Sequence, residues 1–271
     1  MTGAALQNRQ TRMMIYDILL NFFTYGFLGW CTEVAFAAVW QRKFVNRGFL
    51  NGPLCPIYGI GVTAVVVLLE PYTDHLLVLY AASALLVTVL EYITGALLEK
   101  VFHHRWWDYS KMPMNIKGYV CIPFSLIWGA ACVVIVKMIH PVISKVLSLL
   151  PKGLGIFLLA VMCILLIVDI SVTAAGILKW NRHLDKMEEI AVELRSLSDQ
   201  IGENIYQNTI NGLKKQEETR KRIEELKQKY EEMLEGQNRT GRRLIKAFPK
   251  MEPGKHGDLL AELKKKKTDR P

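Results

Sequence analysis

Residues 154–178 read LGIFLLAVMCILLIVDISVTAAGIL, and Asp169 is the only charged side chain in this run. A helix needs roughly 20 predominantly apolar residues to cross the hydrocarbon core of a bilayer. The run is therefore predicted to be a transmembrane helix. On its N-terminal side, four more apolar stretches predict spans at about 17–40, 54–70, 76–99 and 119–139. The sequence thus predicts an all-α fold, a polytopic membrane bundle of about five transmembrane helices.

The second of these stretches differs from the others at its start, where Pro53 and Pro56 lie. Proline restricts the backbone and lacks the N–H group that a helix interior uses. Non-helical backbone at membrane depth is tolerated where protein surrounds it. A full crossing and a re-entrant entry therefore both fit residues 54–70.

The composition narrows the class of protein. Hydrophobic residues make up 51% of the chain, charged residues 22%, and the formal net charge is +9. Basic residues beside apolar spans are typical of a cytoplasmic membrane face, so we do not expect nucleic-acid binding. The five cysteines lie in or beside apolar stretches and are interpreted as small hydrophobic residues. Neither a metal site nor a cofactor is expected.

The short loops between the predicted spans differ in basic charge. Lys and Arg are enriched in cytoplasmic loops. The loops after the first and third spans hold Arg42, Lys43, Arg47, Lys100, Arg105, Lys111 and Lys117. We therefore expect these loops and the C-terminal tail in the cytoplasm, and the N-terminus outside a cell membrane.

The last third of the chain is highly charged. From Trp180 onward it carries 21 of the 34 Lys and Arg residues. Apolar residues follow a heptad track that starts with Leu184, Met187, Ala191 and Leu194. A second track follows a break at a glycine, which predicts either an antiparallel helical hairpin or two coiled-coil segments.

Three regions follow from these patterns. We predict a transmembrane domain over residues 1–180, a cytoplasmic helical tail over 181–235 and a basic, disordered C-terminus over 236–271. The apolar track in residues 184–235 would join two copies of the chain or recruit a cytoplasmic partner. The lysine run at residues 264–267 would lie against anionic lipid.

Three acids lie inside the predicted spans, Glu33, Glu91 and Asp169. Each sits about two thirds of the way along an odd-numbered span, so the three should share one layer. An acid at the centre of a membrane helix costs about 2.5 to 3.5 kcal/mol, so it needs a partner or a wet cavity. We interpret the three as contacts for a cation or cationic group, with polar contacts between helices as the alternative. Glu99 would extend this polar face toward the following loop.

Two segments beside the spans are rich in turn-forming and aromatic residues. Residues 46–61 read NRGFLNGPLCPIYGIG, a density of glycine and proline that favours a specific non-helical entry into a span. Residues 103–110 read HHRWWDYS, and NIKG follows at 115–118. Paired tryptophans are also typical of the membrane interface. A close-packing turn and an interface belt are therefore the alternatives to a functional site.

These motifs, with EYITGALLEKVF before HHRWWDYS and NIKGYVCIPFSLIWG after it, resemble the bacterial ABC-transporter type IV (CmpB-like) membrane permease family over roughly residues 15–180. The resemblance implies a permease role. One departure is Tyr119, where the resemblance implies a basic residue. The matching positions are Asn46, Arg47, Gly48, Asn51, Gly52, Pro53, Pro56, Tyr58, Gly59, Glu91, Glu99, Trp106, Trp107, Asp108, Tyr109, Asn115, Gly118 and Trp128.

Three functions fit the sequence. The first is a transporter permease with a polar site on the cytoplasmic half of the bundle. No nucleotide-binding P-loop pattern occurs in the chain, so an ATPase would be a separate subunit. The second is a membrane-anchored scaffold or sensor that acts through the tail. The third, an enzyme on a lipid-linked substrate, would gain support if Asp108 met His103 or His104 in one pocket. We expect neither catalytic residues nor enzyme activity.

Overall fold

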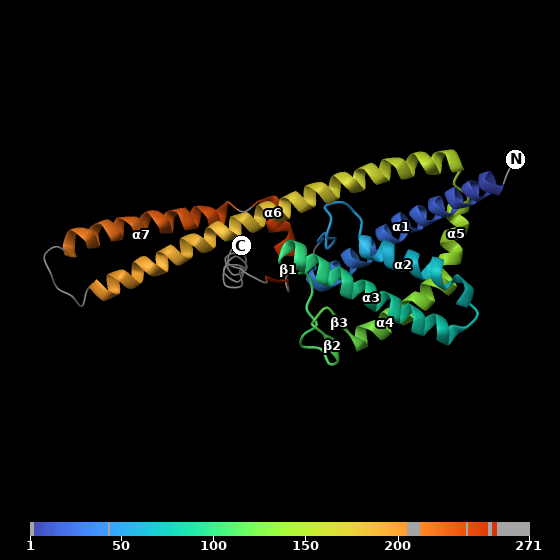
Figure 1. Cartoon of the computed structure of the whole chain (residues 1–271), viewed down its shortest axis with the longest axis horizontal. Helices are drawn as coiled ribbons and strands as arrows, with labels where there is room; N and C mark the ends of the chain where they lie inside the picture. Colours follow the sequence, from blue (N-terminus) through green and yellow to red (C-terminus); the bar gives the residue numbers. More distant parts are fainter. Residues whose placement is uncertain (1–2, 43, 205–211, 237, 249–250, 254–271) are drawn as a thin grey trace.

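The computed structural model describes residues 3–42, 44–204, 212–236, 238–248 and 251–253. A bundle of helices carries a long helical hairpin that projects from one end (Figure 1). The chain is almost entirely helical in the described part, with a few two-residue strands in the loops. The predicted all-α membrane bundle is confirmed.

The elements follow one another in a simple order. The helices are α1 (Gly3–Gln41), α2 (Pro56–Leu69), the 3-10 helix η1 (Glu70–Tyr72), α3 (Leu76–Phe102), α4 (Ile122–Val134), the π-helix η2 (Ile135–Ile139), α5 (His140–Ser148), α6 (Lys152–Asn204), α7 (Gly212–Glu235) and α8 (Arg239–Ala247). The strands are β1 (His104–Arg105), β2 (Asn115–Ile116), β3 (Val120–Cys121) and β4 (Glu252–Pro253). β1 pairs antiparallel with β4, and β2 pairs antiparallel with β3.

The number of full-length spans differs from the five predicted. Four stretches of the described residues are long and apolar enough to cross a membrane: Met14–Gln41, Leu76–Phe102, Ile122–Ser148 and Lys152–Asp199. The remaining predicted span forms the shorter apolar helix Pro56–Tyr72. The 14 residues of α2 rise about 21 Å, less than the roughly 30 Å of a hydrocarbon core.

The position at which α2 begins explains its length. The Cys55 N–H donates to the carbonyl oxygen of Gly26 at 2.9 Å, and Pro56 then occupies the first turn of α2. Gly26 lies roughly four helical turns before the end of α1. The loop of residues 44–55 therefore runs back along the second half of α1 before α2 starts.

Glycine allows α1 and α2 to pack closely. A Cβ atom at Gly29 would collide with the ring and Cβ of Tyr58, and one at Gly59 would lie 2.5 Å from the carbonyl oxygen of Phe22. Side chains at these two positions would force the helices apart. The glycine-rich segment therefore serves two purposes: it forms the non-helical entry into α2, and it lets α1 and α2 pack closely.

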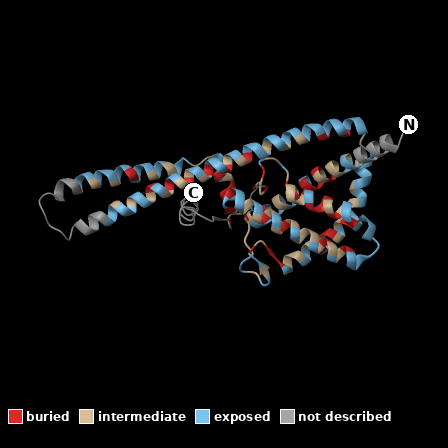
Figure 2. Cartoon of the chain, in the orientation of Figure 1, coloured by how far each residue is buried: buried red, intermediate tan, exposed pale blue. Residues whose placement is uncertain are grey.

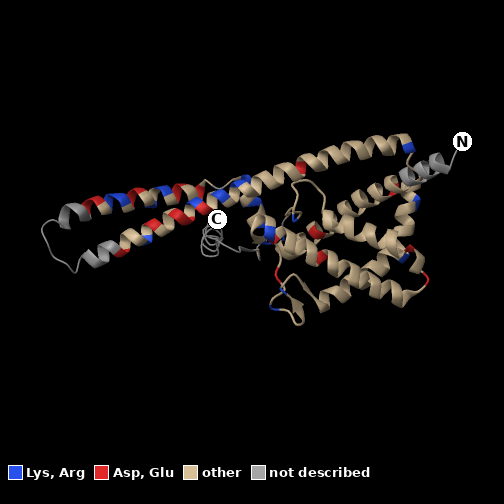
Figure 3. Ribbon diagram, in the orientation of Figure 1, with Lys and Arg blue, Asp and Glu red and all other residues tan. Residues whose placement is uncertain are grey.

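The bundle has the surface of a membrane protein. In the first half of α6, Ile156, Ile164 and Ile167 are each more than 60% exposed. Many large apolar residues of the bundle are exposed, and Figure 2 shows exposed residues along its helices. Figure 3 shows that charged residues gather on the hairpin. Such a large apolar surface requires a nonaqueous environment or a partner.

The tail forms a hairpin with α6. This helix runs unbroken from the bundle through residue 180, where a domain boundary was predicted, to Asn204. α7 lies beside it in the opposite direction (Figure 1). Arg222 forms an ion pair with Glu193 at 3.2 Å, and His183 donates to the carbonyl oxygen of Met233 at 2.8 Å.

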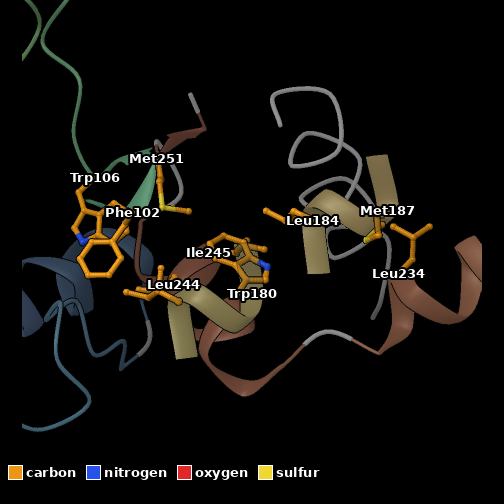
Figure 4. Packing of buried hydrophobic residues seen from close by; sticks show 10 residues of the cluster. Phe102, Trp106, Trp180, Leu184, Met187, Leu234, Leu244, Ile245 and Met251 are labelled. Carbon is orange, nitrogen blue, oxygen red and sulfur yellow. The ribbon is translucent and has the colours of Figure 1, made fainter. Parts of the chain in front are cut away.

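The segment after the hairpin corrects one prediction. We predicted that residues 236–271 would be disordered, but residues 239–247 form α8, which packs back on α6. Its Leu244 and Ile245 join Ile177, Trp180 and other buried residues in one hydrophobic core (Figure 4). Apolar burial outweighs the basic composition of the segment here. The predicted lysine run at 264–267 lies outside the described residues.

Candidate functional site

Both predicted motif segments lie at the end of the bundle from which the hairpin projects (Figure 1). We call residues 44–55 the first motif loop and residues 103–121 the second motif loop. The first joins α1 to α2, and the second joins α3 to α4. Residues that are distant in sequence thus meet at one end of the fold.

Asn46 organises the first motif loop against α1. Its Oδ1 accepts hydrogen bonds from Trp30 Nε1 at 2.8 Å and from the Gly48 N–H at 3.0 Å. Its Nδ2 donates to the carbonyl oxygen of Asn51 at 2.8 Å. One side chain therefore closes the turn and holds it to the bundle.

Asp169 binds the same loop from α6. Its Oδ1 accepts from the Asn51 N–H at 3.1 Å and from Asn51 Nδ2 at 3.0 Å, and its Oδ2 accepts from the Gly52 N–H at 2.7 Å. The Thr173 hydroxyl donates to the same carboxylate at 3.1 Å. A Cβ atom at Gly52 would lie only 3.0 Å from Oδ2. Both carboxylate oxygens of Asp169 therefore accept hydrogen bonds that hold the non-helical backbone of the loop.

Arg243 on α8 binds the loop as well. Its Nη1 donates to the carbonyl oxygens of Gly48 at 2.9 Å and Leu50 at 3.0 Å, and its Nη2 donates to that of Phe49 at 2.7 Å. Burial lowers the pKa of Arg243, and the charge of Asp169 acts against this shift. The sequence analysis missed this residue, because carbonyl oxygens leave no pattern in a sequence.

Glu33 is paired with a base and a phenol. The Tyr58 hydroxyl donates to its Oε1 at 2.8 Å, and Arg47 Nη1 lies 3.5 Å from its Oε2. The Arg47 guanidinium also lies over the ring of Phe36, 5.4 Å from its centroid. α1, α2 and the first motif loop therefore each supply one polar group of this cluster.

Glu91 lies in the middle of α3 and is only 8% exposed. The Tyr109 hydroxyl donates to its Oε1 at 3.3 Å, while Oε2 is buried and has no hydrogen-bond partner among the described residues. Tyr109 itself stacks on Phe124, with ring centroids 5.0 Å apart. The carboxylate is thus half satisfied.

Tyr109 connects the two clusters. Burial raises its pKa first, and the nearby charge of Glu91 and the more distant charge of Glu33 raise it further. Tyr109 therefore lies in the electrostatic field of both carboxylates. Among the described residues, no hydrogen bond or ion pair joins Glu33 to Glu91 directly. Asp169, the third acid of the predicted layer, has its own set of partners on the first motif loop.

The second motif loop is held by a charged cluster. Arg105 donates through Nε to Glu99 at 2.8 Å, and its Nη1 lies 3.5 Å from Asp108. Burial acts to raise the pKa of Asp108, but hydrogen bonds from Ser110 and the charge of Arg105 outweigh it and the pKa is lowered. Arg105 also lies over the ring of Tyr119 at 5.2 Å. A basic group therefore faces the position where the resemblance implied one.

The remaining candidate residues have structural partners. Trp107 Nε1 donates to the Tyr119 carbonyl oxygen at 2.8 Å, and Asn115 Oδ1 accepts from the Gly118 N–H at 3.1 Å. Trp106 belongs to the core around α8, and Pro53 is exposed.

Asp108 and His104, which the enzyme alternative would bring together, have different partners. His104 stacks on Trp180 at 4.9 Å and shares a hydrogen bond with Asn181, whereas the partners of Asp108 are Arg105 and Ser110. Among the described residues, no group of three or more His, Cys, Asp or Glu side chains could hold a metal ion.

Long apolar helices, a buried acid within one of them and two polar loops at one end define a multi-pass helical membrane protein. The sequence pattern of the family described as Putative ABC-transporter type IV matches residues 20–174, more than half of the chain, and the chain belongs to this family. The resemblance seen in the sequence is thereby confirmed. No curated protein and no solved structure matches the chain. The matched range contains both motif loops and ends before the hairpin.

Proposed function

We propose that the chain is the permease component of a transporter, and that Glu91 and Glu33 form its binding site for a cation or a cationic group. The observation that carries this proposal is the state of Glu91, whose Oε2 is buried without a hydrogen-bond partner among the described residues. A buried carboxylate is costly unless a proton, a cation or hydrogen bonds stabilise it.

The two acids have different roles in this site. Glu33 already has a basic neighbour, Arg47, at 3.5 Å. Glu91 has none within ion-pair distance among the described residues, and Tyr109 is its hydrogen-bond donor. Glu91 is therefore the acid that receives the cation, and Tyr109 orients it. Asp169 serves the site indirectly because its oxygens hold the first motif loop.

The first experiment measures thermal unfolding of the purified full chain in detergent with Na⁺, K⁺, Mg²⁺, choline or spermidine. A ligand that binds the folded state raises the midpoint, and the stabilisation grows with the logarithm of the ligand concentration relative to Kd. We expect at least one of these cations to stabilise the parent and the control Glu70→Gln, which changes an exposed acid on η1. Glu91→Gln should lose the response, and Glu33→Gln should weaken it.

The same cation is then followed as an isotope or fluorescent analogue in proteoliposomes. Uptake should fall in the variants that lose binding. The proposal is wrong if Glu33→Gln, Glu91→Gln and Asp169→Asn all bind and take up the cation as the parent does.

The proposed transport also needs a source of energy. The family description names an ABC transporter, and the sequence contains no P-loop pattern. We therefore assign ATP hydrolysis to a separate subunit on the hairpin side, which keeps the predicted cytoplasmic orientation of the tail. Proteoliposomes with the chain alone should show no ATP dependence of uptake.

The hairpin favours a second candidate, a membrane-anchored scaffold. α7 and the C-terminal half of α6 project from the bundle, and many of their residues are charged (Figure 3). The predicted seam residues Leu184 and Met187 are buried inside the chain, so a partner or second copy would bind the charged exterior. Reversing the exposed charges Lys221, Lys227 and Lys229 to Glu should abolish signalling by a scaffold and leave cation uptake unchanged.

A further inference from the structure

The segment from Gly48 to Gly52 is bound from two sides by opposite charges. Asp169 on α6 accepts from the N–H groups of Asn51 and Gly52, and Arg243 on α8 donates to the carbonyl oxygens of Gly48, Phe49 and Leu50. Non-helical backbone within a membrane protein needs a partner for each such group. Without α8, three carbonyl oxygens of this segment lose their donor.

The two sides belong to different parts of the chain. Asp169 lies inside the matched family range 20–174, whereas Arg243 lies far beyond it. The N–H groups of Asn51 and Gly52 are thus satisfied from the matched family range, and the carbonyl oxygens of residues 48–50 are satisfied by the tail. The tail is therefore positioned to change the loop while the core stays folded.

α8 is docked by a specific fit. Asn238 caps the helix by accepting from the Gly241 N–H at 2.7 Å, and its Nδ2 donates to the carbonyl oxygen of Gly176 at 3.0 Å. Gly241 packs on the indole of Trp180 and would not accommodate a side chain, because a Cβ atom there would lie 2.6 Å from the ring. Figure 4 shows Leu244 and Ile245 of α8 beside Trp180.

The same interface contains uncompensated polar groups. Nε of Arg243 and the indole nitrogens of Trp106 and Trp180 are buried and lack hydrogen-bond partners among the described residues. A buried donor without an acceptor loses its hydration and gains nothing in return. The docked state is therefore less stable than its buried apolar surface would indicate, and water could satisfy these groups once α8 leaves.

We propose that α8 is a releasable latch: docked, Arg243 holds the first motif loop closed over Glu33, and undocked, the loop moves and opens the site toward the hairpin. α8 follows α7 in the chain, so displacement of the hairpin by a partner would pull it away. The latch rests on the proposed function only in naming Glu33 as part of the site beneath the loop. Closure of the loop itself can be measured without transport.

The test follows amide hydrogen exchange of Gly48, Asn51 and Gly52 in the full chain by mass spectrometry. Loss of the three Arg243 hydrogen bonds should speed this exchange at least about tenfold in Arg243→Ala. The matched control Arg239→Ala removes an exposed arginine from the same helix and should leave the rates unchanged. Equal rates in Arg243→Ala and the parent would overturn the latch.

A disulfide between α6 and α8 distinguishes a latch that opens from a static contact. This second test remains informative even if the Arg243→Ala variant does not fold. A Cβ atom at Gly176 would lie 3.0 Å from the Cβ of Thr240, so Gly176→Cys with Thr240→Cys can bond after a small shift. If α8 leaves the parent transiently, the oxidised protein should exchange the loop amides more slowly than the parent, and reduction should reverse this. Exchange that is unaffected by oxidation would show that α8 does not open.

These outcomes separate the two proposals. Slower exchange on oxidation together with a normal cation response in Glu91→Gln would support the latch and contradict the cation site. A lost cation response together with loop exchange that is insensitive to both Arg243→Ala and oxidation would support the site and overturn the latch.

Discussion

The two motif loops lie at the same end of the bundle but are stabilised in opposite ways. From Trp107 onward the second motif loop finds its partners nearby, because Asp108 binds Arg105 and Ser110 within a few residues of the chain. Its first residues, in β1, pair instead with β4. The first motif loop depends on Asp169 and Arg243, which are more than 100 residues away in sequence. A loop that is held by distant elements is only as ordered as their docking. The part of the second loop after β1 is therefore the rigid wall of the candidate site, and the first loop is its movable part.

The largest expected effect follows from removing the distant anion. Asp169→Ala leaves the N–H groups of Asn51 and Gly52 without an acceptor and Arg243 without a nearby negative charge. We expect a loss of about 3 kcal/mol in the free energy of unfolding, since several hydrogen bonds to the carboxylate are lost and one to a charged group is worth about 1.5–3 kcal/mol. Chemical unfolding in detergent measures this.

Its control is Ser171→Ala, an exposed residue on the same helix whose hydroxyl bonds only within α6. This variant should match the parent closely. If Asp169→Ala also unfolds at the parent's midpoint, the first motif loop does not depend on α6 and the comparison of the loops fails.

The next effect concerns the rigid loop. Gly118 has a φ of +74°, and a Cβ atom there would lie 2.6 Å from the Ser110 hydroxyl and collide with the Asp108 carboxylate. Gly118→Ala should cost about 2 kcal/mol, the order expected for a side chain forced into this conformation. Gly153→Ala, whose Cβ would meet open space, is the matched control.

The difference between the two motif loops predicts which amides exchange faster in Gly118→Ala. Faster amide exchange should be confined to the second motif loop, because its partners are local. Equal loosening of the first motif loop would show that the two loops form one cooperative unit.

The sequence predicted features with local signals better than features that depend on distant segments of the chain. The acids Glu33, Glu91 and Asp169 were identified because a charge in an apolar run is conspicuous and needs a partner. Glu91 and Tyr109, both taken from the sequence motifs, do contact each other. Whether the acids bind a cation stays a prediction.

The features that were missed all depend on distant chain segments. Hydropathy finds the apolar run of α2, but it does not show that Cys55, the residue before the helix, bonds to Gly26 and thereby shortens the helix. The composition of residues 236–271 favours disorder, yet Leu244 and Ile245 find a core that other elements provide. Arg243 binds carbonyl oxygens 193 to 195 residues away, and no local pattern marks such a contact.

The smallest expected effect is the sharpest test of the difference between the loops, because two tryptophans make equivalent bonds. Trp30 Nε1 donates to Asn46 and Trp107 Nε1 donates to the Tyr119 carbonyl oxygen, both at 2.8 Å. Trp30→Phe and Trp107→Phe should each cost about 1 kcal/mol, the net value of one hydrogen bond. Local exchange should differ, because Asn46 transmits the loss of Trp30 to Gly48 of the first motif loop, while the loss of Trp107 stays in the second. Identical exchange patterns in the two variants would contradict a movable first loop beside a rigid second one.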